Sequence, residues 1–284
     1  MSTLLSFGHG YSAQALTRLL PPDWRVIGTT RDEAKAAALM AQGVEPRIWP
    51  GADMGPALDA ATHLLISAAP DGAGDPVLRE LRDEIAARAG RFAWVGYLST
   101  TGVYGDHGGG WVTEESPLTP ATARGQARVA AEAAWAELGL PLHVFRLAGI
   151  YGPGRGPFAK VRAGTARRIV KPGQVFSRIH VADIAQVLWA SIRAPAPGTA
   201  YNLCDDDPAP PEDVIAYAAA LLGLPVPEAE DFDTAEMTPM ARSFYAESKK
   251  VSNRRIKEDL GVVLRYPDYR SGLRALLTAE RDGD

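Results

Sequence analysis

The stretch Leu4-Leu5-Ser6-Phe7-Gly8-His9-Gly10-Tyr11-Ser12-Ala13 joins a short apolar run to a glycine loop, and a helical segment follows at 13–20. The loop matches the pattern G-x-G-x-x-A. In that pattern the first glycine makes a tight turn, the second lets the backbone approach a pyrophosphate, and the small third residue lets the helix pack closely on the strand. The start of the helix offers N–H groups to the anion. We therefore predict a dinucleotide site at Gly8, Gly10, Tyr11, Ser12 and Ala13.

The same loop also has a weak likeness to the nucleophile turn of hydrolases, G-x-S-x-G. Gln14 stands where that motif requires its second glycine. The hydrolase turn also belongs after a later strand of its fold. Dinucleotide binding is therefore the better interpretation.

Short β-rich runs recur about every twenty residues and alternate with alanine-rich segments of helical spacing. They lie at 4–7, 25–29, 44–48, 63–67, 93–98 and 142–146, with one more at 200–203 after a predicted helix at 181–193. Alternating strands and helices predict an α/β fold, a doubly wound parallel sheet of the Rossmann type with helices on both faces.

The regular alternation stops after Tyr151, where a glycine- and proline-rich stretch and then a basic stretch begin. We expect an NAD(P)-binding Rossmann domain formed by 1–151 and 180–203. A smaller, discontinuous substrate lobe is predicted from 152–179 and 204–264, with a C-terminal helix at 265–284.

The composition excludes several classes of protein. Thirty basic and 34 acidic residues among 284 give a net charge of −4, so no general electrostatic attraction to nucleic acid is expected. The chain has one cysteine and no apolar run of the roughly 20 residues that a membrane span needs. Its first residues lack the basic start of a signal peptide. The five histidines show no metal-ligand pairing, so no metal is expected. We predict a cytoplasmic protein without nucleic-acid or membrane partners.

The choice of dinucleotide depends on the end of the second predicted strand, which runs into Thr29-Thr30-Arg31. An arginine there can pair with the 2′-phosphate of NADP, whereas a carboxylate would bind the ribose hydroxyl of NAD. Thr30 and Arg31 therefore predict NADP. Asp32 and Glu33 follow directly, and a shift of one residue would favour NAD.

Further segments follow the glycine loop in a characteristic order. They are 98–105 (LSTTGVYG), 114–117 (EESP), 146–154 (RLAGIYGPG), 179–185 (IHVADIA), 201–203 (YNL) and 260–261 (LG). Together with the glycine loop, this series resembles the extended short-chain dehydrogenase/reductase family, also known as the NAD-dependent epimerase/dehydratase family.

The resemblance implies hydride transfer at a nicotinamide and a substrate held between the two lobes. It adds Ala68, Ala69 and Gly149 to the cofactor residues. It also implies that Tyr104, Arg155 and Arg178 contact the substrate. A homodimer formed through helices beside the sheet is expected by the same analogy.

One departure from the family is serious, because its catalytic Y-x-x-x-K pair is missing. Arg124 and Arg128 stand at the Tyr and Lys positions, with Glu132 four residues later, and no Tyr or Lys occurs from 105 to 150. Arginine is effectively always protonated, so it cannot replace a tyrosine acid. The predicted catalytic residues are then Thr100, at the family's Ser/Thr position, with Arg124 on an anionic substrate group and Arg128 on the nicotinamide ribose. The alternative places both arginines on a solvated helix face.

The sequence contains other candidate proton donors and acceptors. Tyr245 and Lys249 have the Y-x-x-x-K spacing, but they lie over a hundred residues too late and are predicted not to reach the nicotinamide. Tyr104, His107 and Tyr151 are candidates near the Thr100 turn, and the glycines at 108–110 suggest a flexible flap. The basic stretch 160–178 suggests a phosphate site in the lobe or, equally, a solvated face.

Two functions remain open at this point. The first is an NAD(P)-dependent oxidoreductase or epimerase that acts on a small nucleotide-sugar or carbonyl substrate. The second is an NADP(H)-binding sensor or scaffold that has lost catalysis.

Overall fold

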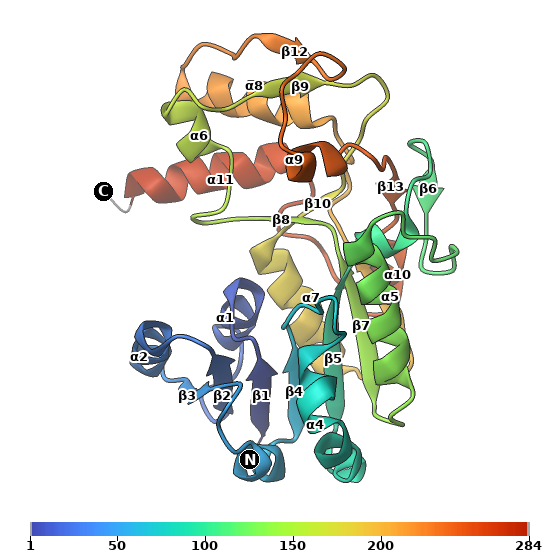
Figure 1. Ribbon diagram of the computed structural model, residues 1–284. Coiled ribbons are helices and arrows are strands. Elements are labelled where there is room, and N and C mark those ends of the chain that lie inside the picture. Colours follow the sequence, from blue (N-terminus) through green and yellow to red (C-terminus); the bar gives the residue numbers. More distant parts are fainter. Residues whose placement is uncertain (1, 283–284) are drawn as a thin grey trace.

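The computed structural model describes residues 2–282, and a seven-stranded parallel sheet lies at its centre (Figure 1). The strand order is β3-β2-β1-β4-β5-β7-β11. These strands are β1 (Thr3–Phe7), β2 (Arg25–Thr30), β3 (Glu45–Ile48), β4 (His63–Ile66), β5 (Trp94–Thr100), β7 (Leu142–Leu147) and β11 (Ala200–Leu203). The helices of this domain are α1 (Tyr11–Thr17), α2 (Glu33–Ala41), α3 (Gly55–Ala60), α4 (Pro76–Ala86), α5 (Ala123–Ala136) and α7 (Val181–Arg193), with short 3₁₀ turns η1 (Ala89–Arg91) and η2 (Thr101–Tyr104). The predicted fold class is confirmed.

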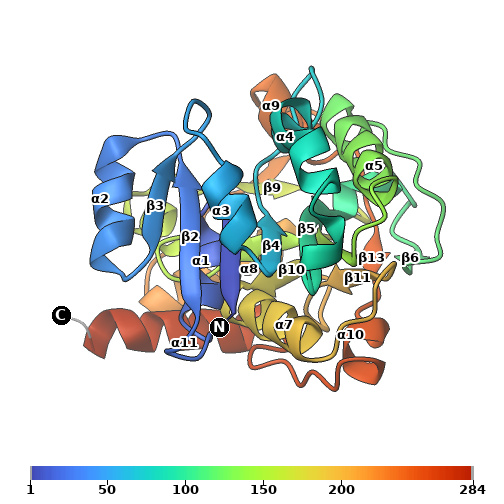
Figure 2. The same cartoon turned by 90° about the horizontal axis from the view of Figure 1, so that it is seen from below.

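The sheet is covered by helices on both faces because its strands are apolar on both sides. Leu4 and Leu5 are neighbours on β1 and point to opposite faces. Leu4 shares a core with Leu16 of α1 and Ile184 of α7, whereas Leu5 shares another with Leu81 of α4. Figure 2 shows α3, α4 and α5 on one side of the sheet and α7 on the other.

A smaller lobe lies beyond the carboxyl ends of the strands (Figure 1). It contains α6 (Phe158–Arg162), α8 (Pro211–Leu222) and α11 (Tyr269–Asp282), and the strand pairs β8 (Gly149–Tyr151) with β10 (Arg178–His180) and β9 (Arg168–Val170) with β12 (Ala229–Asp231). Phe158, Val214 and Leu273 share its core. The C-terminal helix α11 is therefore part of this lobe.

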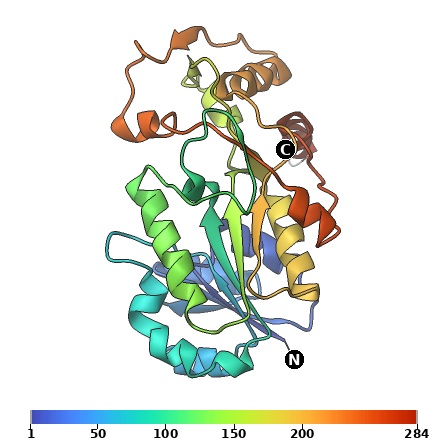
Figure 3. The same cartoon turned by 90° about the vertical axis from the view of Figure 1, so that its right-hand side faces the viewer.

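The chain leaves the lobe through α9 (Pro239–Ser243) and returns to the large domain. There β13 (Lys250–Val251) pairs with β6 (Trp111–Val112), and α10 (Arg254–Glu258) packs near β11. Figure 3 shows this dark-orange segment running down beside the large sheet. Ile256, Val262 and Leu264 are buried in the same core as α7. Residues 250–264 thus differ from the predicted lobe boundary, because their apolar side chains are buried against the sheet domain.

No helix in the described part of the chain has both the length and the apolar character needed to span a bilayer.

Candidate functional site

A cleft of about 860 Å³ lies between the carboxyl ends of the central strands and the small lobe. Ligands of open α/β sheets bind at this edge. Nine of the predicted site residues line it: Tyr11, Ser12, Ala69, Thr100, Arg124, Arg128, Gly149, Arg155 and Arg178. The other predicted residues do not line it: Gly8, Gly10, Ala13, Thr30, Arg31, Ala68 and Tyr104.

The glycine loop turns sharply between β1 and α1. Gly8 has a φ of 76°, and a Cβ on it would come within 2.9 Å of the backbone nitrogen of Ala68. Around Gly10 the nearest atom to such a Cβ would be the Gly8 oxygen at 3.7 Å, so the space above the second glycine is open. Ala13 is completely buried where α1 packs on the sheet. These are the three properties that the motif predicts for a loop that lets a ligand approach the backbone.

His9, between the two glycines, is turned inward. Its backbone N–H donates to the Thr29 oxygen at 2.9 Å, and its ring lies against Gly28, where a Cβ would come within 2.7 Å of the ring. Burial lowers the pKa of His9 to about 4, so the ring is neutral at physiological pH. His9 therefore fixes the loop onto β2 and brings no charge to the site.

The end of β2 presents an arginine. Arg31 is exposed, and its guanidinium forms no ion pair with any carboxylate of residues 2–282. The neighbouring carboxylate of Asp32 accepts a hydrogen bond from the Lys35 N–H at 3.1 Å and caps α2. The acid next to Arg31 thus caps a helix through one of its oxygens, while the arginine is free to meet an anion.

Thr100 ends β5 at the floor of the cleft, and its Oγ1 accepts from the Gly102 N–H at 3.2 Å. Arg128 of α5 donates to the Leu98 carbonyl at 2.6 Å and to the Tyr97 hydroxyl at 3.2 Å. Arg124 lies with its guanidinium 5.3 Å from the ring centre of Phe244. Both arginines therefore reach the cleft wall, although Arg124 is also exposed to solvent, and Arg128 holds α5 against β5.

Tyr97 does not supply the missing tyrosine. It is fully buried, and burial raises its pKa to about 12. A hydroxyl with this pKa does not exchange protons readily near neutral pH.

Tyr104, predicted to contact substrate, lies in the core instead. Its hydroxyl donates to Asn202 Oδ1 at 2.7 Å and accepts from Arg146 at 3.0 Å. Arg146 also pairs with Glu132 at 2.9 Å, and Ser99 donates to the same carboxylate. This buried network joins α5, β5, β7 and β11, so Tyr104 supports the site from beneath.

The other predicted proton sources are also poorly placed. His107 is outside the cleft lining, and its Nε2 lies 3.2 Å from the Tyr104 carbonyl. Tyr151 lines the cleft, but burial raises its pKa far above the ordinary value. The predicted flap at 108–110 is tied down, since the Gly109 N–H donates to the Ser248 carbonyl at 2.9 Å.

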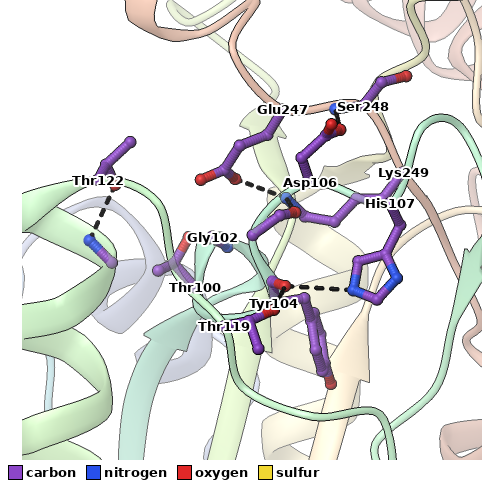
Figure 4. Close-up of polar contacts among 12 residues, drawn as sticks. Thr100, Gly102, Tyr104, Asp106, His107, Thr119, Thr122, Glu247, Ser248 and Lys249 are labelled. Carbon is purple, nitrogen blue, oxygen red and sulfur yellow. Dashed lines mark hydrogen bonds and ion pairs between the residues drawn. The ribbon is translucent and has the colours of Figure 1, made fainter.

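Lys249 lines the cleft, together with a carboxylate that the sequence did not indicate. Its Nζ donates to Glu247 Oε2 at 2.6 Å and to the Gly105 carbonyl at 2.7 Å (Figure 4). Both side chains line the cleft, whereas Tyr245 does not. The Y-x-x-x-K spacing drew attention to Lys249, but no pattern in the sequence indicated Glu247.

Two arginines of the basic stretch 160–178 form ion pairs within the lobe. Arg162 forms an ion pair with Glu280 at 2.5 Å, and Arg167 pairs with Glu230. Arg178 is the one basic residue of the stretch that lines the cleft, where it donates to the Phe176 and Ala209 carbonyls at 2.8 and 3.0 Å. Burial lowers the pKa of Arg178. Of the basic residues in this stretch, Arg178 alone is thus placed to meet a ligand in the cleft.

Comparison with known proteins agrees with this geometry. No family model matches the chain. Protein YeeZ of Escherichia coli K12 is 30% identical over 260 residues, which cover 86% of this chain and 89% of YeeZ. The structure of a functionally unknown conserved protein from Silicibacter pomeroyi is 64% identical, with a TM-score of 0.96 over 98% of this chain and 99% of that one. UDP-glucuronic acid 4-epimerase from Bacillus cereus, in complex with UDP-glucuronic acid and NAD, has a TM-score of 0.80 at 14% identity over 99% of this chain and 100% of that one.

The fold is that of the NAD-dependent epimerases and dehydratases of the extended short-chain dehydrogenase/reductase type. Within this class, the chain belongs to the family of protein YeeZ. The resemblance drawn from the motifs is confirmed at the level of the fold.

Proposed function

We propose that the protein binds NADP and acts as an NAD(P)-dependent oxidoreductase or epimerase on a small nucleotide-sugar or carbonyl substrate. One observation carries the proposal: a single cleft joins Tyr11 and Ser12, which follow the glycine loop, to Thr100 at the end of β5 and Arg178 of the lobe. One end of the cleft fits a dinucleotide and the other fits a substrate.

The chain's own residues fit the dinucleotide. The open backbone above Gly10, with Tyr11 and Ser12, would hold the pyrophosphate, and Ala69 and Gly149 would flank the remainder. When bound, the nicotinamide supplies a hydride acceptor or donor. Thr30 and Arg31 would meet the 2′-phosphate of NADP, which is favoured because the exposed Arg31 has no carboxylate partner among residues 2–282.

On the substrate side, Thr100 would hold the reacting oxygen by its hydroxyl. Arg124, Arg155 and Arg178 line the same cleft and present guanidinium groups suited to a phosphate or carboxylate. Relatives in fold bind UDP-sugars, and the Bacillus cereus epimerase was observed with UDP-glucuronic acid. A nucleotide sugar is therefore the first substrate class to test.

A second candidate is an NADP(H)-binding sensor that performs no catalysis. Arg128 favours the sensor function. It stands at the position of the family's lysine, and it donates hydrogen bonds to the Leu98 carbonyl and the Tyr97 hydroxyl. The sensor would bind NADPH and change its partner or oligomeric state without turning over any substrate.

The test is a fluorescence titration with NADPH and NADH on the wild type, Arg31→Ala and the control Arg193→Ala, which removes an exposed arginine at the far end of α7. A charge-assisted hydrogen bond contributes about 1.5–3 kcal/mol. The Kd for NADPH should therefore rise about tenfold or more in Arg31→Ala, with the Kd for NADH unchanged. An unaltered NADPH preference would refute the role of Arg31, and failure to bind either dinucleotide would refute the function.

A further inference from the structure

We propose that Glu247 and Lys249 form the proton-transfer pair of the cleft, with Glu247 as the catalytic carboxylate and Lys249 as its positioning residue. The inference rests on the proposed function and supplies what α5 lacks. Figure 4 shows the two side chains meeting above the turn that begins at Thr100.

The pair is enclosed and incompletely satisfied. The side chains of Lys249 and Glu247 are only 10% and 11% exposed, and the Nζ–Oε2 distance is 2.6 Å. The second carboxylate oxygen, Glu247 Oε1, is buried and has no hydrogen-bond partner among residues 2–282. A buried acceptor without a donor is costly, and a hydroxyl bound in the adjoining cleft would relieve that cost.

Alternate residues of the segment that leads into β13 face the cleft. Glu247, Lys249 and Val251 all line the cleft, whereas Ser248 points away and its Oγ donates to the Gly173 carbonyl at 3.1 Å. In an extended chain alternate residues share a face. The period of two therefore presents the carboxylate and the ammonium to the cleft together.

Hydrogen bonds on both sides fix this segment. The Ser248 N–H donates to Asp106 Oδ1 at 2.7 Å, and the Ser248 carbonyl accepts from the N–H groups of His107 and Gly109 at 3.1 and 2.9 Å. On the other side, Gln174 Nε2 donates to the Glu247 carbonyl at 2.7 Å. The carboxylate is thus held in advance of any ligand, as acid–base catalysis requires.

Stability gives little reason to keep such a pair. Removing two charges from water is expensive, and replacing a buried ion pair with apolar residues is often neutral or stabilising. This buried pair borders the cleft, and Glu247 Oε1 has no hydrogen-bond partner among residues 2–282. A role in catalysis explains such a pair better than a role in stabilising the fold.

The proton balance is simple. When a substrate alcohol is oxidised, its O–H bond breaks, a bond from that hydrogen to Glu247 Oε1 forms, and the C–H electron pair leaves as hydride to the oxidised dinucleotide. Lys249 holds Oε2 by its hydrogen bond throughout. The reverse proton transfer accompanies carbonyl reduction. Arg124 and Arg128 cannot do this, because a guanidinium does not release its proton.

The charged groups around the pair belong to several elements. Asp106 and His107 lie in the loop after η2, and Lys171 follows β9 near Asp106. The arginines of the cleft wall are Arg124, Arg128, Arg155 and Arg178. None of these groups is substituted in the variants below. A change in the pH profile of kcat in a Glu247 variant can therefore be assigned to the Glu247 carboxylate.

The experiment compares the wild type with Glu247→Gln, Glu247→Asp and Lys249→Met. Glu228→Gln and Lys160→Met are matched controls, because these side chains are exposed. NADPH affinity is measured by fluorescence, turnover with UDP-glucuronic acid and UDP-glucose as probes across pH 5–9, and stability by thermal unfolding. A double variant, Glu247→Leu/Lys249→Met, tests whether the pair serves the fold.

The kcat of Glu247→Gln should fall at least 100-fold, since general acid–base catalysis contributes about 10²–10⁴-fold. Its Kd for NADPH should stay within about twofold of wild type. Glu247→Asp should recover part of the kcat with an altered pH profile, Lys249→Met should lower kcat more than it raises KM, and the controls should match wild type. The double variant should unfold at the wild-type temperature or above and show no turnover.

Three outcomes would overturn the proposal. They are a Glu247→Gln kcat within threefold of wild type with the same pH profile, a double variant that loses its stability, and a wild type that binds NADPH but turns over neither probe. The last result would leave dinucleotide binding intact and favour the sensor. Absence of NADPH binding would instead overturn the function itself.

Discussion

Asp205 makes the stability of this protein depend on pH in an unusual direction. The residue follows β11 and is 1% exposed, and neither carboxylate oxygen has a hydrogen-bond partner among residues 2–282. Burial raises its pKa from 3.8 to about 8, with nearby Arg178 opposing the rise. Between these two values the folded protein binds one proton that the unfolded chain has released. This contribution to stability is therefore complete below pH 3.8 and is lost as the pH rises towards 8.

The magnitude follows from the linkage relation. One proton corresponds to 1.36 kcal/mol per pH unit, so from pH 5 to pH 7 the Asp205 contribution to the free energy of unfolding should fall by about 2.7 kcal/mol. In Asp205→Asn the side chain stays neutral at every pH. Relative to wild type, the variant should therefore gain about 2.7 kcal/mol over this interval.

The assay is urea unfolding of the wild type, Asp205→Asn and the exposed control Asp233→Asn at pH 5, 6 and 7. Burial lowers the pKa of His9, His63 and His180 to about 4, so these groups make stability rise with pH over part of the range. All the proteins share them, and they cancel in the difference between variant and wild type. Parallel curves for wild type and Asp205→Asn would refute the reasoning, whereas Asp233→Asn should run parallel.

Two further substitutions test the support of the site. Glu132→Gln removes the partner of Arg146 in a pair whose side chains are each 8% exposed, and it should cost about 3–5 kcal/mol of unfolding free energy; a loss below 1 kcal/mol in urea unfolding would show that Arg146 finds another partner. Gly272→Ala places a Cβ against the Tyr151 hydroxyl where α11 meets the cleft wall, and overpacking of this kind costs about 1–3 kcal/mol. Gly90→Ala is its control, since a Cβ there meets nothing within 4 Å, and equal melting temperatures for the two variants would contradict the clash.

The local patterns predicted the fold because each depends on neighbouring residues. The apolar runs at 4–7 and 63–67 became β1 and β4, whose side chains are buried on both faces. The G-x-G-x-x-A loop took the expected turn at Gly8 for the same reason: its requirements lie in its own backbone. The return of residues 250–264 to the large domain was missed, because the burial of Ile256 depends on partners far away in the chain.

The candidate site shows the same division. Thr100, Arg124 and Arg128 could be placed near one another by motif and register, and all three line the cleft. The prediction that Tyr104 contacts the substrate was wrong. The direction of its hydroxyl depends on Arg146 and Asn202, which come 42 and 98 residues later in the chain. Sequence spacing cannot show which of two possible faces a hydroxyl turns to when its partners come from other strands.

The sequence alone determined the strand and helix alternation, the glycine loop and the absence of a Tyr/Lys pair from 105 to 150. Each of these features depends on residues that are close together in the chain. Only the tertiary structure decided that Glu247 and Lys249 meet at the cleft, because Ser248 is held there by its N–H donating to Asp106 and by its carbonyl accepting from His107 and Gly109. A contact across some 140 residues follows from the packing of the lobe against the sheet, which local spacing does not encode.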